Sequence, residues 1–135
     1  MAGNRKAEIL TLLREGRDYV SGQELCEKLG VSRTAVWKAI GQLKKEGYSI
    51  EAVQNRGYRL GNTETEEAVY GQNELDSRME TSWAGHPVHF FEEIGSTNIQ
   101  AKLEAENGAR HGSLIVADMQ TAGKGRRGRA WSSPK

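Results

Sequence analysis

The segment 120–131, which reads Gln-Thr-Ala-Gly-Lys-Gly-Arg-Arg-Gly-Arg-Ala-Trp, concentrates positive charge among glycines. Glycines let backbone N–H groups approach a phosphate closely, and neighbouring cations offset its negative charge. The segment therefore predicts a loop that is disordered when empty and becomes ordered around an anionic ligand. A tail that binds nucleic acid without sequence preference is the other interpretation. The cations concerned are Lys124, Arg126, Arg127 and Arg129.

Positions 123–128 also satisfy the pattern Gly-x-Gly-x-x-Gly of dinucleotide-binding proteins. Such a site needs a helix directly after the glycines and an acidic residue about twenty positions further on. The residues at 129–134, Arg-Ala-Trp-Ser-Ser-Pro, begin no apolar helix, and no such acid follows in the sequence. We therefore reject a dinucleotide site.

A second polar group, Ser96-Thr97-Asn98, lies between two predicted strands at 88–91 and 114–117. We expect Ser96 or Thr97 to begin a helix that runs to residue 106 and ends at Asn107-Gly108. Hydroxyl and amide groups at a helix N-terminus either cap the helix or bind a ligand beside its free N–H donors. The strand–helix–strand order predicts an α/β domain.

The first sixty residues have the spacing of three helices. An apolar stripe predicts the first helix over 5–15. Ser21 and Glu24 have the spacing of a capping box at the start of the second, and Ser32 caps the third. Each predicted helix ends at a glycine, namely Gly16, Gly30 and Gly47.

The second and third helices meet at Leu29-Gly30-Val31-Ser32, which predicts a helix-turn-helix rather than a plain helical hairpin. The second helix of such a pair lies in the DNA major groove and contacts the bases through its N-terminal and outward residues. For Trp37 two roles stay open, packing at the domain edge or contact with the DNA backbone. The core face of this helix is predicted to be Val36, Ile40 and Leu43. Its predicted DNA contacts are Arg33, Thr34, Trp37 and Lys38.

Two short strands are predicted next, over 48–53 and 58–60, with Gln-Asn-Arg-Gly at 54–57 as the turn between them. A hairpin directly after a recognition helix is the wing of a winged helix. Arg56 at its tip is predicted to contact phosphate or the minor groove.

Composition excludes several protein classes. The 135 residues are 36% hydrophobic and 27% charged and contain no long apolar run, so we expect no transmembrane helix. The N-terminus does not read as a secretory signal. Cys26 is the single cysteine and cannot form an internal disulfide, which favours a cytoplasmic protein. We predict a helix-packing role for Cys26 rather than a nucleophile, and we assign no catalytic or metal-binding residue.

The net charge of +1 conceals a segregation of charge. Residues 1–60 carry eleven basic and seven acidic side chains, residues 61–109 two and ten, and residues 110–135 six and one. Such asymmetry indicates different partners for different segments. We divide the chain into a winged helix-turn-helix at 1–62, an acidic linker with a short helix at 63–82, and the start of an α/β domain at 83–135. We expect Asn73 to cap the short helix, which runs to Met79.

The motifs together resemble those of the biotin protein ligases of the repressor type. The segment 92–98, Glu-Glu-Ile-Gly-Ser-Thr-Asn, is similar to the Ser-Thr-Asn motif of that family, and 120–131 is similar to its biotin- and adenylate-binding loop. The resemblance covers essentially the whole chain. It implies an α+β fold, with an N-terminal winged helix-turn-helix followed by the truncated start of a class II synthetase-like α/β ligase domain.

Members of this family join biotin and ATP, the latter with Mg²⁺, into biotinyl-5′-adenylate and transfer the biotin to a lysine of a carboxylase carrier protein. They also dimerise when the adenylate is bound and repress biotin genes on operator DNA. The resemblance implies adenylate contacts from Arg126, Arg127 and Trp131. It implies a biotin site lined by Ser96, Thr97, Asn98, Gln120, Lys124, Gly125 and Arg126.

Two departures from the family pattern matter. Lys124 stands where some members have Arg, so a point charge replaces a planar fork. A family lysine that contacts biotin and adenylate would lie beyond Lys135, so we expect this chain alone to be inactive as a ligase and to retain DNA binding. A winged-helix regulator that senses a different ligand is the alternative. A lipoate ligase relative would bring neither this winged helix nor this loop.

Overall fold

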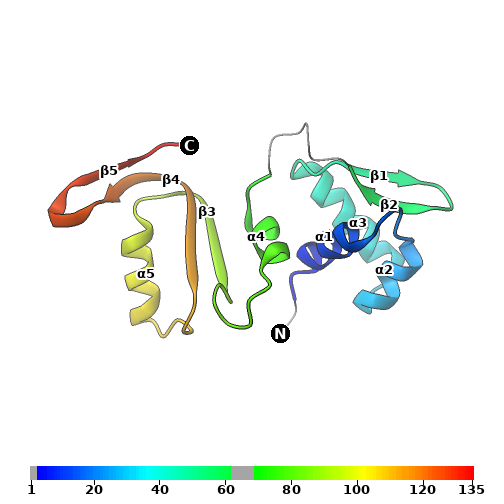
Figure 1. The fold of residues 1–135 in the computed structure, drawn as a ribbon, viewed down its shortest axis with the longest axis horizontal. Helices are drawn as coiled ribbons and strands as arrows, with labels where there is room; N and C mark the ends of the chain where they lie inside the picture. The colour runs from blue at the N-terminus through cyan, green and yellow to red at the C-terminus, as the bar shows by residue number, and fades with distance from the viewer. Residues whose placement is uncertain (1–2, 62–68) are drawn as a thin grey trace. The chain divides into compact units, whose positions relative to one another are not determined.

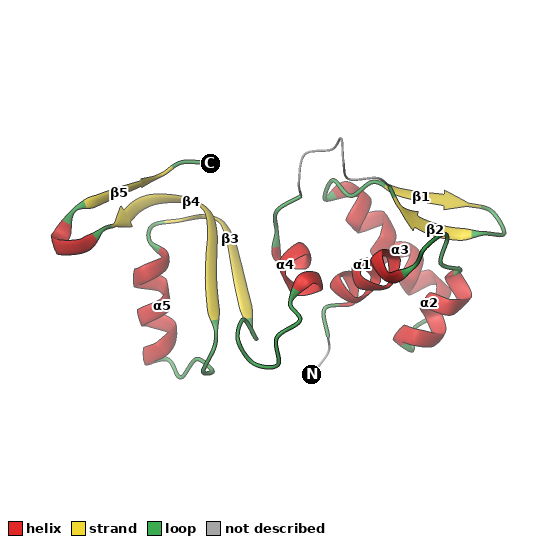
Figure 2. Ribbon diagram, in the orientation of Figure 1, coloured by secondary structure: helices red, strands yellow, loops and turns green. Residues whose placement is uncertain are grey.

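The computed structural model describes residues 3–61 and 69–135. The chain divides into two compact units, one of Met1–Val69 with Asp76–Arg78 and the other of Tyr70–Leu75 with Met79–Lys135. Figure 1 follows the chain through both units, and Figure 2 distinguishes their helices from their strands. In the described ranges, no helix has the length and apolar character needed to cross a membrane.

The first unit begins with three helices, as predicted. They are α1 (Arg5–Glu15), α2 (Gly22–Leu29) and α3 (Arg33–Lys45). The Ser21 hydroxyl accepts a hydrogen bond from the Glu24 N–H at 3.0 Å, and the Ser32 hydroxyl accepts one from the Ala35 N–H at 3.2 Å. Both predicted N-caps are thus confirmed. The return bond of the capping box is not formed, because the Glu24 carboxylate pairs with Lys28 Nζ at 2.8 Å.

The turn between α2 and α3 has the conformation that the sequence predicts. Gly30 has φ +62°, and the Val31 N–H donates to the Cys26 carbonyl oxygen at 3.2 Å. This left-handed residue closes the C-terminus of α2 and turns the chain sharply into α3. Val31 and Cys26 are both half-buried against the apolar core, so the packing role of Cys26 is confirmed.

The wing follows α3 after a second left-handed turn. Gly47 has φ +103°, and the Tyr48 N–H donates to the Leu43 carbonyl oxygen at 3.1 Å, which completes a Schellman motif. Because Tyr48 is used to close the helix, the first strand begins later than predicted. The hairpin consists of β1 (Ile50–Val53) and β2 (Gly57–Leu60), which pair antiparallel with Val53 opposite Gly57.

A backbone bridge joins the wing to the segment between α1 and α2. The Val20 N–H donates to the Tyr58 carbonyl oxygen at 2.8 Å, and the Tyr58 N–H donates to the Val20 carbonyl oxygen at 2.9 Å. Gly57 makes this approach possible, because a Cβ at that position would lie 2.1 Å from the Val20 carbonyl oxygen.

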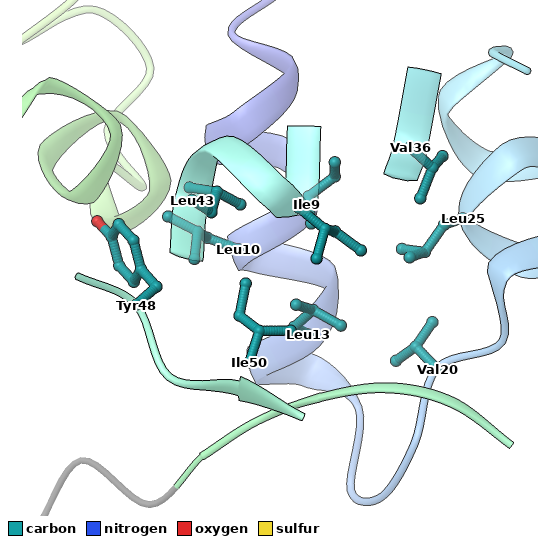
Figure 3. Close-up of a cluster of buried hydrophobic side chains, with 10 residues drawn as sticks. Ile9, Leu10, Leu13, Val20, Leu25, Val36, Leu43, Tyr48 and Ile50 are labelled. Atoms are coloured by element: carbon teal, nitrogen blue, oxygen red, sulfur yellow. The ribbon is translucent and has the colours of Figure 1, made fainter. Parts of the chain in front are cut away.

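The core of the first unit lies among the helices and the base of the wing. Figure 3 shows the side chains of Leu25 and Val36 facing each other between α2 and α3, and Ile50 of β1 beside Leu13 of α1. The predicted core face of α3 is confirmed, since each of its three apolar residues is at most 3% exposed. The buried cluster is made by Ile9, Leu10, Leu13, Val20, Leu25, Val36, Ile40, Leu43, Tyr48 and Ile50.

Helix α4 (Gln72–Arg78) corresponds to the predicted short helix but begins two residues earlier than a helix capped by Asn73 would. Gly71 occupies the N-cap position and makes no side-chain cap, so the prediction that Asn73 caps this helix is wrong. In the first unit, the Thr11 hydroxyl donates to the Ser77 carbonyl oxygen at 3.2 Å. Of the predicted acidic linker, residues 63–68 lie outside the described part of the chain.

The second unit is a three-stranded sheet with one long helix. Its elements are β3 (Val88–Ile94), α5 (Thr97–Glu106), β4 (Leu114–Lys124), η1 (Arg126–Gly128) and β5 (Ala130–Ser133). The strand order is β3-β4-β5, with β3 and β4 parallel and β4 and β5 antiparallel. The predicted strand–helix–strand order is confirmed.

The glycine- and arginine-rich segment forms a hairpin at the end of β4. Lys124 pairs with Ala130, and the Gly125 N–H donates to the Arg129 carbonyl oxygen at 2.8 Å. In this structure the predicted loop is confined to the turn, because strand pairing satisfies the backbone on both sides of it, and the predicted ordering around an anionic ligand stays a prediction. Glycine serves here as a close-packing residue, since a Cβ on Gly123 would lie 2.5 Å from the Trp131 carbonyl oxygen.

We predict that Gly57→Ala destabilises the first unit by about 2–4 kcal/mol, because the new Cβ meets backbone and the residue keeps a positive φ. Urea denaturation followed by circular dichroism measures this loss. Gly41→Ala is the matched control, since Gly41 lies in α3 with open space around it. That change should stabilise the unit by about 0.5–1 kcal/mol. A Gly57→Ala variant as stable as the wild type would contradict the close approach at Val20.

Candidate functional site

The outward face of α3 carries the side chains predicted to contact DNA. Arg33, Thr34, Trp37 and Lys38 are all exposed, opposite the buried face of the helix. Trp37 exposes 67% of its surface, so the structure does not support the interpretation that it packs at the domain edge. The face therefore offers two cations, a hydroxyl and an aromatic ring to a partner.

A hydrogen-bond relay from α2 holds the first of these residues. Arg33 Nη2 donates to Gln23 Oε1 at 3.1 Å, and Gln23 Nε2 donates to Glu27 Oε1 at 2.8 Å. Among the described residues, the partner of Arg33 is thus a neutral amide and no ion pair is made, so the contact orients the guanidinium without neutralising its charge. Sequence reasoning missed Gln23, since nothing in the local spacing indicates a contact across the turn.

A groove of about 470 Å³ separates the N-termini of α2 and α3 from the wing. Arg33 lies on the helical wall and Arg56 on the wing wall, so the groove brings together two cations that are far apart in sequence. The other lining residues are Ser21, Gly22, Gln23, Val36, Ala52, Val53, Gln54, Asn55, Gly57 and Tyr58.

The wing arginines belong to a surface cluster of charges. Arg59 Nη2 lies 2.7 Å from Glu51 Oε2, and Arg56 Nη2 lies 3.1 Å from Asp18 Oδ2. The hydrogen bond from Arg59, followed by that from Tyr19, lowers the pKa of Glu51. The same two hydrogen bonds to Glu51 raise the pKa values of Arg59 and of Tyr19. The charged groups are exposed and Tyr19 is half-buried, so the cluster orients side chains more than it stabilises the fold.

The second unit brings both ligand motifs to one pocket. A cavity of about 530 Å³ is lined by residues from α5, β4 and β5. Of the residues predicted for biotin or adenylate, it contains Thr97, Asn98, Gln120, Lys124 and Trp131. Sequence reasoning missed Ala101, Ser113, Leu114 and Ile115, which complete the lining without a motif of their own.

Two hydrogen bonds to Gln120 connect the motifs directly. The Thr97 N–H and the Thr97 hydroxyl donate to Gln120 Oε1 at 2.9 and 3.1 Å. The Ala122 N–H donates to the Gly95 carbonyl oxygen at 2.8 Å, which fixes β4 against the turn before α5. The carboxamide of Gln120 therefore occupies the place of an N-terminal cap for α5 and holds the pocket wall in position.

Ser96 lies beside this pocket with an unsatisfied polar atom. Its side chain is 3% exposed, and its Oγ has no hydrogen-bond partner among the described residues. Ser96 occupies the N-cap position of α5 but makes no side-chain cap. A buried hydroxyl without a partner is costly, which points to a use in binding rather than in folding.

The remaining predicted ligand residues lie at the turn of the 120–131 hairpin and do not line the pocket. Gly125 is half-buried, whereas Arg126 and Arg127 are exposed. Arg127 has φ +56°, a backbone conformation that residues other than glycine rarely adopt. Among the described residues, no group of His, Cys, Asp or Glu has the arrangement of a metal site.

We predict that Ser96→Ala leaves the stability of the chain unchanged or raises it by about 1 kcal/mol, because it removes an unpaired buried hydroxyl. Thr97→Val is the matched control. It removes a hydroxyl that is bonded to Gln120 and should cost about 1 kcal/mol. Thermal unfolding of both variants tests the contrast, and a larger loss for Ser96→Ala than for Thr97→Val would contradict it.

Comparison with known proteins gives two kinds of match. A family described as an HTH domain matches residues 5–59. Proteins named bifunctional ligase/repressor BirA match nearly the whole chain. The protein of Bacillus subtilis strain 168 is 40% identical over 129 residues, which are 96% of this chain and 39% of the relative. The proteins of Salmonella typhimurium and Escherichia coli K12 are 38% and 35% identical, over 93% and 94% of this chain.

The chain thus spans about two fifths of the length of the curated relatives that it matches. The matched HTH domain coincides with the described helices and wing of the first unit. Along nearly its whole length, the chain is similar to proteins named bifunctional ligase/repressor BirA, and its residues 5–59 match an HTH domain.

Proposed function

We propose that the chain supplies the DNA-binding domain and part of the biotin site of a bifunctional biotin protein ligase and repressor. The observation that carries the proposal is the pocket of the second unit, where Thr97 and Gln120 bond to each other across two separate motifs. The relatives' printed name combines ligase and repressor, and the two units offer one site for each role.

In the ligase role, biotin and ATP are the substrates. An oxygen of the biotin carboxylate attacks the α-phosphorus of ATP, pyrophosphate leaves, and the mixed anhydride biotinyl-5′-adenylate forms. A lysine amine of the carrier protein then attacks the acyl carbon, and AMP leaves. In this chain, Asn98, Gln120 and the unpaired Ser96 hydroxyl would bind the polar groups of biotin, and Lys124 would offset the negative charge that develops at phosphorus.

The hairpin turn has a separate part in the proposal. Arg126 and Arg127 lie between the lining residues Lys124 and Trp131 in the sequence. They do not line the pocket themselves and belong to an exposed turn. We assign them to the adenylate phosphate, with Trp131 against the adenine ring, because the exposed cations are able to close over an anion. Trp131 lines the pocket and is 64% exposed, which leaves its ring available for stacking.

In the repressor role, operator DNA is the partner, and the adenylate-bound protein acts as a homodimer. The exposed face of α3 enters the major groove, and the wing contacts the neighbouring backbone. Arg33 lies at the start of α3 and makes no ion pair with the described residues, as expected for a base or phosphate contact at the N-terminal end of a recognition helix.

We predict that Arg33→Ala and Lys38→Ala each weaken the binding of duplex DNA by about 5- to 100-fold. Fluorescence anisotropy over a range of salt concentrations measures affinity and salt dependence together. Lys28→Ala removes the same charge from α2, where it is paired with Glu24, and serves as the matched control. Unchanged affinity in both α3 variants would remove this helix from the DNA interface.

For the ligase role, we predict that biotin binds the protein extended to the full length of its relatives and that Gln120→Ala weakens this binding at least about tenfold. Isothermal titration with biotin, with and without ATP, tests the prediction. Gln100→Ala is the control, because Gln100 lies in α5 outside the pocket and bonds to Glu104. If biotin is not bound, the winged-helix regulator of a different ligand becomes the better proposal.

A further inference from the structure

Tyr19, in the connection between α1 and α2, lies against both arginines of the wing. The Arg56 Cζ is 4.7 Å from the centre of the Tyr19 ring, and the Arg59 Cζ is 4.9 Å from it. Both distances are within the range of cation–π contacts. The next residue, Val20, is buried and bonded to Tyr58 through both backbone groups, so the backbone that carries the ring is fixed.

The two arginines have different surroundings. Arg59 donates to Glu51 at 2.7 Å, and Glu51 also accepts the Tyr19 hydroxyl at 3.0 Å. Arg59 is not among the residues that line the groove of the first unit. Its charge is therefore compensated inside the cluster, where it holds Glu51 and the Tyr19 ring in place.

Arg56 lines the groove and has weaker partners. The side chain is 59% exposed, its face lies over the Tyr19 ring, and one nitrogen donates to Asp18 at 3.1 Å. A guanidinium has five N–H donors, and Asp18 is the one hydrogen-bond acceptor that the described residues give it. Most of its donors are therefore available to an acceptor outside the cluster.

A carboxylate and a phosphodiester are both anionic acceptors for an arginine fork. An arginine already held on a ring loses less side-chain entropy when it binds a phosphate. Asp18, exposed and singly bonded, is an acceptor that a phosphate is able to replace.

We propose that Tyr19 positions Arg56 for a backbone phosphate of duplex DNA, and that Asp18 occupies the place of that phosphate until DNA binds. This inference rests on the proposed DNA-binding function of the first unit. According to this inference, two residues that lie outside both the recognition helix and the wing determine the DNA affinity, and their effects have opposite signs. Tyr19 favours binding, and Asp18 competes with it.

The test measures the affinity of the whole chain for a fluorescent DNA duplex of random sequence over a range of salt concentrations. Tyr19→Leu removes the ring and should weaken binding by about two- to fivefold. Tyr19→Phe keeps the ring, loses only the hydroxyl, and should retain the wild-type affinity. Asp18→Asn should tighten binding and steepen the slope of log affinity against log salt by up to about 0.9, the value of one added phosphate contact.

Two controls separate positioning from a structural role. In an Arg56→Ala background, Tyr19→Leu and Asp18→Asn should have no further effect, because both act through Arg56. A purely structural Tyr19 would weaken binding equally in both backgrounds. Asp118→Asn removes the same charge from the second unit and should leave DNA affinity unchanged.

The outcomes are distinct. If the wild-type chain binds no duplex DNA, the proposed DNA-binding function falls and this inference falls with it. If DNA is bound but Asp18→Asn does not tighten binding, or Tyr19→Leu acts equally without Arg56, only the inference is overturned. Should Tyr19→Leu fail to fold, the Asp18→Asn variant still tests the inference, because Asp18 is exposed and asparagine has nearly the same shape as aspartate.

Discussion

The backbone pairing of Val20 with Tyr58 is the constraint on which the geometry of the first unit depends. Its two hydrogen bonds, 2.8 and 2.9 Å long, attach the wing to the segment that connects α1 and α2. The Val20 side chain is 5% exposed and belongs to the core, so the pairing is anchored in the hydrophobic cluster. The wing wall of the groove is thus held by the same residues that stabilise the helices. Only a glycine at position 57 lets the two backbones come this close.

Features set by neighbouring residues could be predicted from the sequence. The serine caps, the left-handed Gly30 and the apolar spacing of α3 are local, so the helices and the turn between them follow from them. The start of β1 could not be located in the same way, because Tyr48 has the composition of a strand residue but closes α3. Asn73 is a common capping residue, yet Gly71 begins α4. In both cases, competition between two local signals decided the boundary.

Features that depend on distant residues escaped prediction. The glycines of 120–131 were interpreted as flexible, whereas Gly123 is needed where the two strands of a hairpin approach. Both ligand motifs were recognised, but the bonds of Thr97 to Gln120 depend on the parallel pairing of β3 with β4, which brings Gln120 opposite Ile94. In the first unit, the position of Arg56 between two predicted strands indicates that it lies at the wing tip. Its contact with Tyr19 could not be predicted in this way, because Tyr19 belongs to a distant segment.

The two arginines that line the groove have different partners, and this difference has a kinetic consequence. Arg33 is oriented by a neutral amide, so its charge acts at long range from the start of an encounter. Arg56 is paired with a carboxylate, which cancels most of its field until a phosphate is close enough to take the place of Asp18. Charges that act at a distance govern association, whereas exchange at contact governs dissociation. The recognition helix should therefore control how fast DNA is found, and the wing how long it is held.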